Sequence, residues 1–297
     1  MNKEIPLVSI IATCYNHEKY CLEALDSLKN QTYKNTELII IDDCSTDNTV
    51  GVIEKWIEKN NYDCNFIKHQ KNVGLIKGAN EGLEAANGLY YNFCSLDDIA
   101  LPNKIEIQTK AFETNFNALL VISDIEVIDE NSVLKNKSFI RELMGRDQFP
   151  TSNYIEEFFK SDYLLSPSYL CHSRLFDVIG EFDENLVFED FDKKLAILTK
   201  EVEFVIVDKP TVRYRMFGDS MSNASSKRYC IQNLKTIKKY IKDPKVRPFL
   251  KSKLARFSRL LLAEEKSMTT LKWLFINVSI NKNKKAIKLL AKFFLKK

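Results

Sequence analysis

The chain has 297 residues, enough for one large domain or for a domain with an appendage. It is 45% hydrophobic and 28% charged, which is ordinary for a soluble globular protein, and no apolar run approaches the ~20 residues of a membrane-spanning helix. Seven Cys without a C-x-x-C pair and only three His argue against a disulfide framework, a zinc site and a histidine-rich metal centre. They favour a reducing compartment, and we expect a cytoplasmic protein.

Charge is distributed unevenly along the chain. Residues 1–225 carry 23 Lys and Arg against 37 Asp and Glu, a net charge of −14, whereas residues 226–297 carry 21 against 3, a net charge of +18, which together make the overall +4. Such a split is typical of a binding or catalytic body joined to a basic region that meets an anionic partner. We therefore predict a catalytic domain over 1–225 and a basic helical region over 226–297.

The first hundred residues alternate between two patterns. Unbroken apolar runs, which are typical of buried strands, occupy residues 7–13, 37–45, 64–69 and 89–95. Helical patterns lie between them, over 18–30, 49–60 and 75–88. Because parallel strands need crossovers and are buried on both faces, this alternation predicts an α/β fold with a mostly parallel sheet flanked by helices. In such sheets the ligand site lies beyond the carboxyl ends of the strands.

The pattern becomes less regular after the first hundred residues. In chain order, the predicted elements are a helix after Pro102, a strand pair or one long bent strand over 118–132, one helix near 153–161 in an otherwise irregular 133–166, a strand then a helix over 168–180, a helix over 189–200, and a strand with a proline-marked bend over 203–216. From Ser226 onward we predict basic helices, with breaks near Pro244 and around Asn281–Asn283.

Polar residues follow the first, second and fourth strands. Thr13 ends the first and Tyr15 comes just after it, where a tyrosine ring can stack on a base and a threonine can bind the edge of the base. Asp43 ends the second and can accept a hydrogen bond from a base or a ribose. Asp97 and Asp98 end the fourth, where adjacent carboxylates can hold a divalent metal with the diphosphate it neutralises. Each also has a plain structural explanation, namely packing for the tyrosine and Asx turns or helix caps for the acids.

A glycine and a lysine after the third strand extend this pattern. Gly74 lets the backbone pass close to a ligand, and Lys77, one helical turn further on, is able to reach a phosphate. A glycine at the start of a helix is common, so this pair alone decides nothing. No G-x-G-x-x-G follows the first strand, which argues against a Rossmann-type oxidoreductase.

Several longer stretches carry a family resemblance. The chain reads PLVSIIATCYNHEKY, ELIIIDDCSTDNT, NVGLIKGAN and CSLDDIALPNKIE, followed by VIGEFDEN, FEDFD and YRMFGDSMS. In this order and spacing they resemble the family 2 glycosyltransferases of the GT-A fold, over residues 6–222, and most of all enzymes that build bacterial surface polysaccharides. The resemblance implies a Rossmann-like sheet and transfer of a sugar from a nucleotide-sugar, usually a UDP-sugar, to a glycan or lipid-linked glycan acceptor.

The resemblance also implies roles for single residues. Thr13, Tyr15 and Asp43 match positions that hold the nucleotide base, and Asp97 matches the acid that bears a divalent metal bridging the donor diphosphate. Asp190 matches the general base. The implied reaction is a single displacement with inversion at the anomeric carbon, in which Asp190 takes the proton from the acceptor hydroxyl.

Two positions depart from the family pattern. The family's D-x-D-D is Ser95-Leu96-Asp97-Asp98 here, so a hydroxyl that can bind a ribose replaces the first acid, and the histidine of a late Y-R-x-H segment is Phe217. With two ligands fewer, we expect Mg²⁺ or Mn²⁺ to be weakly held, mainly through the donor's phosphates and water. The departures also leave open a non-catalytic nucleotide-binding or polysaccharide-assembly module.

The basic region carries no catalytic motif. Its last stretch, KKAIKLLAKFFLKK, places lysines on one helical stripe and apolar residues on another, as in helices at a membrane interface. Trp273 and Phe275 are further candidate apolar anchors. One interpretation is peripheral attachment to anionic lipid through 269–297, and the other is packing on the catalytic body or pairing of subunits. Nucleic-acid binding is not expected, because the chain has no reader motif.

Overall fold

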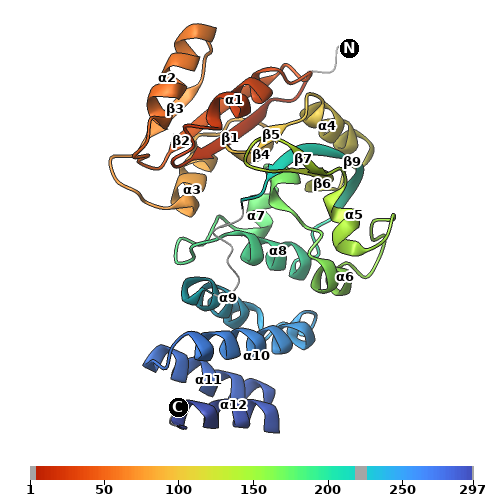
Figure 1. Cartoon of the computed structure of the whole chain (residues 1–297). Helices are drawn as coiled ribbons and strands as arrows, with labels where there is room; N and C mark the ends of the chain where they lie inside the picture. The colour runs from red at the N-terminus through yellow and green to blue at the C-terminus, as the bar shows by residue number, and fades with distance from the viewer. Residues whose placement is uncertain (1–4, 218–225, 296–297) are drawn as a thin grey trace. The chain divides into compact units, whose positions relative to one another are not determined.

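The computed structural model describes residues 5–217 and 226–295, which form two compact units (Figure 1). Within this part of the chain, the first unit contains residues up to 187 and 200–217, and the second contains 188–199 and 226–295. Every described strand belongs to the first unit, and the described elements of the second are helices. Residues 218–222 of the YRMFGDSMS stretch lie outside the described residues.

The sheet has the strand order β3-β2-β1-β4-β8-β6-β9-β5, and β7 pairs with β6. Its parallel half consists of β3 (Asn65–Lys68), β2 (Thr36–Asp42), β1 (Val8–Cys14) and β4 (Tyr90–Ser95). These strands coincide with the apolar runs of the sequence to within a few residues. Both faces of this half are covered, which is why its strands are apolar without interruption.

The other half of the sheet mixes directions. It contains β8 (Leu170–His172), β6 (Leu120–Ile128), β9 (Phe204–Arg215), β5 (Ile99–Ala100) and β7 (Leu134–Asn136). β8 runs antiparallel to β4 and β6, whereas β6 and β9 are parallel with a register shift near Pro210. Since proline cannot donate a ladder hydrogen bond, the predicted bend lies at this irregularity. The sequence analysis did not predict the two-residue β5.

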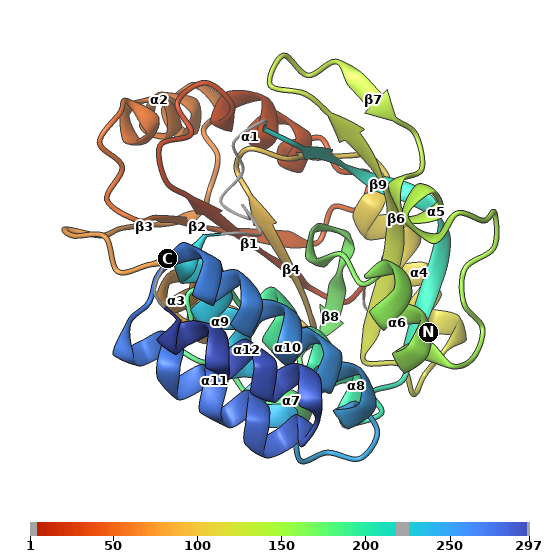
Figure 2. The same ribbon diagram turned by 60° about the horizontal axis from the view of Figure 1, so that its bottom comes forward.

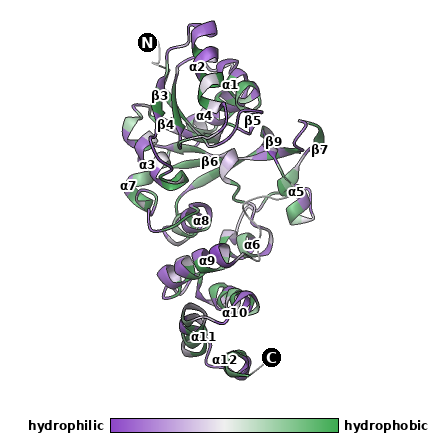
Figure 3. Ribbon diagram, turned by 60° about the vertical axis from the view of Figure 1, so that its left-hand side comes forward, coloured by the Kyte–Doolittle hydropathy of each residue, from purple (hydrophilic) through white to green (hydrophobic). Residues whose placement is uncertain are grey.

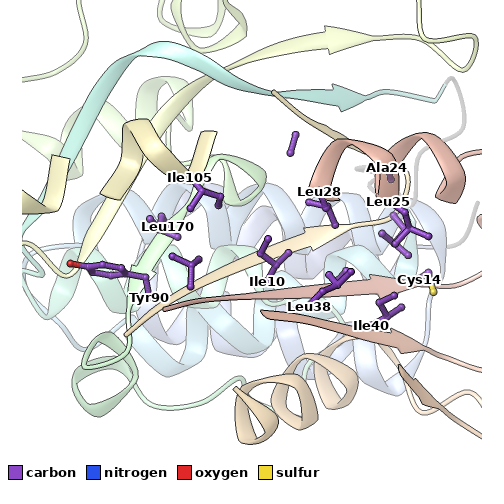
Figure 4. Close-up of a cluster of buried hydrophobic side chains, with 14 of the residues drawn as sticks. Ile10, Cys14, Ala24, Leu25, Leu28, Leu38, Ile40, Tyr90, Ile105 and Leu170 are labelled. Atoms are coloured by element: carbon purple, nitrogen blue, oxygen red, sulfur yellow. The ribbon is translucent and has the colours of Figure 1, made fainter. Parts of the chain in front are cut away.

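Helices cover both faces of the sheet. Those of the first unit are α1 (Cys21–Lys29), α2 (Thr49–Asn60), α3 (Leu75–Ala85), α4 (Lys104–Thr114), α5 (Phe139–Met144), α6 (Tyr154–Ser161) and α7 (Leu175–Ile179), with a 3₁₀ turn over Ser166–Ser168. Alternate residues of β1 face opposite cores. Ile10 packs in a cluster with Leu25 of α1 and Ile105 of α4 (Figure 4), and Ile11 lies in a separate cluster with Ala85 of α3.

Helix α5 is an element that the sequence analysis missed in the irregular 133–166 segment. Its start is held by Asp124, a fully buried residue of β6 whose carboxylate accepts the Ser138 hydroxyl and, at 3.1 Å, the Ile140 N–H. An acidic side chain at the first turn of a short helix satisfies N–H groups that have no intrahelical partner. This tertiary contact supplies an N-terminal anchor that no local pattern signals.

The second unit is a stack of helices, α8 (Asp190–Thr199), α9 (Lys227–Tyr240), α10 (Arg247–Glu264), α11 (Met268–Asn281) and α12 (Lys284–Phe294). Figures 1 and 3 show α9 to α12 layered in chain order, and in Figure 2 the same helices overlap at the front of the view. Three of them begin at side-chain caps, in which Ser226, Ser267 and Asn283 accept backbone N–H groups. The breaks predicted near Pro244 and Asn281–Asn283 are confirmed. No described helix is both long and apolar enough to span a bilayer.

Candidate active site

Three parallel strands end side by side at one edge of the sheet. The register pairs Cys14 of β1 with Asp42 of β2, and Thr13 of β1 with Ser95 of β4. The hydroxyl of Thr13 donates to the Cys94 carbonyl at 3.5 Å, and the ring of Tyr15, just beyond the strand, is 44% exposed. The predicted residues that follow these strands therefore meet at one edge, as expected for a doubly covered parallel sheet.

Asp43 anchors the loop before α3. Its two carboxylate oxygens accept the N–H groups of Val73 at 2.7 Å and of Gly74 at 2.9 Å. Gly74 has φ of 91°, a conformation that L side chains avoid, so glycine is needed where the loop turns. His69 Nδ1 lies 3.1 Å from Oδ1 of Asp43, which leaves acceptor capacity mainly on Oδ2. A carboxylate fixed in this way is preorganised toward a donor group of a ligand.

His69 links Asp43 to Glu81 of α3. Its Nε2 lies 2.6 Å from Oε2 of Glu81, and its side chain is 10% exposed. Burial lowers the pKa of His69, but the hydrogen bonds and charges of Asp43 and Glu81 outweigh it and raise the pKa overall. Lys77, the predicted phosphate ligand, lies 4.0 Å from Glu81 and has a half-exposed side chain. The lysine is therefore loosely held and can be recruited by an anion.

The carboxylate of Asp42 forms its hydrogen bonds within a turn. It is 1% exposed, and its carboxylate accepts the Ser45 N–H at 2.9 Å together with the Ser45 hydroxyl. Asn16, which has φ of 58°, ties the loop after β1 to the same turn, because its side chain accepts the Thr46 N–H at 2.8 Å. These bonds make an Asx turn that carries the neighbouring loops. Asp42 is thus structural.

The adjacent acids Asp97 and Asp98 are held in different ways. Asp98 is 6% exposed and accepts the backbone N–H of Arg215 at 2.8 Å. Burial, and then the charge of Asp97, raise the pKa of Asp98 well above its usual range. By contrast, the Asp97 carboxylate accepts no hydrogen bond from any residue that the structure describes, and its side chain is 19% exposed. Of these two adjacent acids, only Asp97 is left open to a ligand.

Arg215 supports this pair of acids, and the sequence analysis assigned it no role. Its guanidinium is buried, donates from Nε to the Asp97 carbonyl at 2.8 Å, and lies 3.1 Å from a carboxylate oxygen of Glu23. The guanidinium also stacks over Tyr20 at 4.5 Å. A rigid fork of donors can satisfy several acceptors at once, so Arg215 locks the turn that presents Asp97. The available signal was an arginine at the end of a predicted strand.

His17 is a second residue that the sequence analysis missed. Its Nε2 lies 3.9 Å from Oδ2 of Asp97, and its backbone N–H donates to the Thr49 hydroxyl at 2.8 Å. Burial lowers the pKa of His17 and outweighs the opposing charge of Asp97. A neutral imidazole beside a free carboxylate combines the nitrogen and oxygen donors that Mn²⁺ accepts. The described residues contain no group of three or more His, Cys, Asp or Glu that could hold a metal.

The remaining predicted positions belong to different units of the chain. Phe217, at the position where the family resemblance implies a histidine, packs on Tyr20 with ring centroids 5.5 Å apart. Asp190 is the first residue of α8, in the second unit. Its neighbour Glu189 has a pKa raised to about 7, first by burial and then by the charge of Asp190. Two adjacent acids with different environments are typical of sites that exchange protons.

Comparison with known proteins decides the family. A model described as "Glycosyl transferase family 2" matches residues 9–176, more than half of the chain. The chain belongs to glycosyl transferase family 2. A relative in Methanocaldococcus jannaschii, an uncharacterised glycosyltransferase, is 28% identical over 243 residues, which cover 81% of each chain. Another in Rickettsia typhi is 34% identical over 198 residues, which cover 64% of this chain and 58% of the relative.

Solved structures place this glycosyltransferase in the GT-A fold. S. aureus TarS in complex with UDP-GlcNAc matches with a TM-score of 0.64 at 18% identity, covering 98% of this chain and 89% of that one. The mannosyltransferase PcManGT from Pyrobaculum calidifontis, in complex with GDP-Man and Mn²⁺, matches with a TM-score of 0.63 at 14% identity, covering 97% and 84%. The predicted α/β fold with appended C-terminal helices is therefore confirmed.

Proposed function

We propose that this glycosyltransferase moves a hexosyl or N-acetylhexosaminyl group, with inversion, from a nucleotide-sugar to a glycan or lipid-linked glycan acceptor. The donor is a UDP-sugar, and the product belongs to bacterial cell-surface polysaccharide. The observation that carries the proposal is the carboxylate of Asp97, which accepts no hydrogen bond from the described residues, whereas Asp42, Asp43 and Asp98 at the same edge each accept a backbone N–H. The ligands of TarS and PcManGT, UDP-GlcNAc and GDP-Man, support a nucleotide-sugar donor.

We assign the residues the roles that the family resemblance implies, and their positions near one edge of the sheet support this assignment. Tyr15 offers its exposed ring to the base, Thr13 and Asp43 bind the edge of the base, and Ser95 donates to the ribose. The backbone at Gly74 passes close to the donor, and Lys77 turns from Glu81 to a phosphate oxygen. Preorganised groups of this kind lower the barrier because they need little reorganisation during reaction.

The chemical step requires a general base and a positive charge that offsets the negative charge on the leaving group. Asp190 removes the proton from the acceptor hydroxyl as that oxygen attacks the anomeric carbon, and the bond to the nucleoside diphosphate breaks with inversion. Burial, and then the charge of Asp190, raise the pKa of the neighbouring Glu189 to about 7, so Glu189 is partly protonated near neutral pH.

The residues fit a divalent cation that the protein holds through few atoms. Asp97 would supply a free carboxylate and His17 a nearby imidazole nitrogen, and water and donor phosphates would complete the coordination. A cation bound there would offset negative charge on the leaving diphosphate. The Mn²⁺ in the PcManGT structure supports this reading, and we propose weak binding of Mn²⁺ or Mg²⁺ because Ser95 and Phe217 replace two ligands.

Thermal stability against UDP, GDP, dTDP and CMP, each with and without Mn²⁺ or Mg²⁺, tests this proposal. Selective stabilisation by UDP that Mn²⁺ or Mg²⁺ increases is the expected result. Stabilisation without metal would move the diphosphate onto Lys77 or another cation. No response to any nucleotide would favour the second candidate, a module that kept the fold and lost the chemistry, which the substitutions at Ser95 and Phe217 support.

The basic region suggests where the enzyme works. We propose a cytoplasmic protein bound peripherally to the inner face of the membrane through 269–297, where lipid-linked acceptors are found. In α12 the apolar side chains of Ile287 and Phe294 are 55% and 65% exposed among lysines, which supports an interfacial helix. Binding of the protein to anionic but not neutral vesicles at low salt tests the attachment.

A further inference from the structure

A groove opens within the second unit, between the end of α9, the start of α10 and one side of α11. It has a volume of about 790 Å³ and is lined by four cationic side chains and by apolar side chains of α11. That volume is in the range of sites for small organic ligands and exceeds what a single phosphate needs. Every lining residue belongs to this unit, so the groove is complete without the sheet.

The cations of the groove have few partners. Lys239 pairs with Asp192 at 3.0 Å. Lys238, Lys242 and Arg247 form no ion pair and no side-chain hydrogen bond with any residue described in 5–217 or 226–295. Like charges that converge in one groove repel one another and create a positive potential, which an anionic ligand offsets.

Helix stability does not explain these charges. Lys238 lies in the last turn of α9, where a cation suits the helix dipole. Arg247, however, is the first residue of α10, and a cation at that end opposes the dipole. Arg247 therefore has an unfavourable interaction with the dipole of α10, which a bound anion would offset.

The other wall of the groove is apolar. Phe275 of α11 is 53% exposed at the groove, and the half-buried Ile276 follows it. Trp273, which the sequence analysis paired with Phe275 as an anchor, is 5% exposed and so belongs to the core of the helices. An exposed aromatic ring beside unpaired cations matches a ligand with an anionic head and a hydrocarbon portion.

We infer that this groove binds an anionic phospholipid of the bilayer, with its phosphate against Lys238, Lys242 and Arg247 and the adjoining hydrocarbon against Phe275 and Ile276. The inference rests on the proposed attachment to anionic lipid, and it extends the attachment from 269–297 to cations at the end of α9 and the start of α10. A polyanion without hydrocarbon would satisfy the cations but leave the phenyl ring in water. A neutral apolar partner would bury the ring and leave the cations unpaired, at a high desolvation cost.

Sedimentation with vesicles of phosphatidylcholine containing phosphatidylglycerol tests the site on the full chain. The groove variant is Lys238→Gln/Lys242→Gln/Arg247→Gln, and the matched control, with the same loss of charge, is Lys284→Gln/Lys285→Gln/Lys288→Gln on α12. Since each cation at the surface contributes about a factor of five, the groove variant should bind on the order of 10²-fold more weakly than the wild type. The control should bind at least about tenfold more tightly than the groove variant.

Equal losses in the two variants would overturn the groove and leave attachment by diffuse charge or by α12. If the wild type did not bind anionic vesicles, this result would contradict both the lipid-binding groove and the peripheral attachment. The nucleotide-dependent thermal stability would still test the proposed enzyme activity independently. Phe275→Ser, compared with Phe294→Ser, probes the hydrocarbon wall without a change of charge, and heparin is the polyanion probe. We expect Phe275→Ser to weaken vesicle binding severalfold and to leave heparin binding unchanged. Unchanged vesicle binding in this variant would overturn the lipid in favour of a polyanion.

Discussion

The two units satisfy their charged groups in opposite ways. At the sheet edge of the first unit, Asp42, Asp43 and Asp98 each accept backbone N–H groups, so most of the negative charge supports loops. In the second unit, the side chains of Lys238, Lys242 and Arg247 at the groove form no ion pair and no hydrogen bond with the described residues. Charge clusters that look alike in sequence are therefore structural where backbone donors converge on them and open to ligands where they do not.

The largest effect is expected when the buried guanidinium of Arg215 is removed from the first unit. Arg215→Met should destabilise the fold by about 3–5 kcal/mol, because it leaves Glu23 and two carbonyls without their donor. Arg213→Met is the control on the same strand, since Arg213 pairs with Glu126 at a side-chain exposure of 43% and should cost less than about 1 kcal/mol. Urea unfolding measures both. Equal costs would show that Arg215 is dispensable to the turn.

The next largest effect is expected at Asp190, which would give the second unit a catalytic role in addition to its basic charge. Asp190→Asn should reduce sugar transfer by at least about 10²-fold, the usual effect of removing a general base, and leave nucleotide binding nearly unchanged. Single-turnover transfer and nucleotide-dependent thermal stability separate the two effects. Loss of both together would make Asp190 a structural residue.

A smaller effect separates the two adjacent acids. Asp97→Asn should weaken Mn²⁺ binding at least about tenfold in the presence of UDP, with little change in stability, because its carboxylate makes no hydrogen bond to the described protein. Asp98→Asn should change stability and the geometry of the turn while keeping most of the affinity for Mn²⁺, because Asp98 is buried against Arg215. Electron paramagnetic resonance of free Mn²⁺ reports the affinities. The reverse pattern would assign the metal to Asp98.

The smallest effect is a pH dependence of stability at His69, the partner of Asp43 and Glu81. Because its neighbours raise the pKa of His69 in the folded state, the protonated ring stabilises the fold, and this contribution is complete below the pKa of ~6.5 in the unfolded chain. The contribution is lost as the pH rises through the raised pKa. His69→Gln should therefore cost on the order of 1 kcal/mol at low pH and progressively less at higher pH. Urea midpoints of both proteins across pH 5.5 to 9 check the sign, and a cost that grew with pH would contradict it.

Much of the first unit could be read from the sequence by itself. The apolar runs at β1, β2, β3 and β4 predicted their strands, and helix α2 begins and ends where its pattern does. The motifs placed Thr13, Tyr15, Asp43 and Asp97 near one edge, because parallel strands must end together. Such features depend on local periodicity and on the direction of the chain, and both are written in neighbouring residues.

Tertiary structure alone decided which of these residues are open to a ligand. Asp97 and Asp98 are identical neighbours in sequence, and they differ because the N–H of Arg215, 117 residues away, reaches only Asp98. Helix α5 exists because Asp124 lies under its first turn, and 188–199 joins the C-terminal helices although strand β9 follows it. Hydrogen bonds and burial between distant segments set these outcomes, since a carboxylate is a ligand or a scaffold according to the donors that surround it.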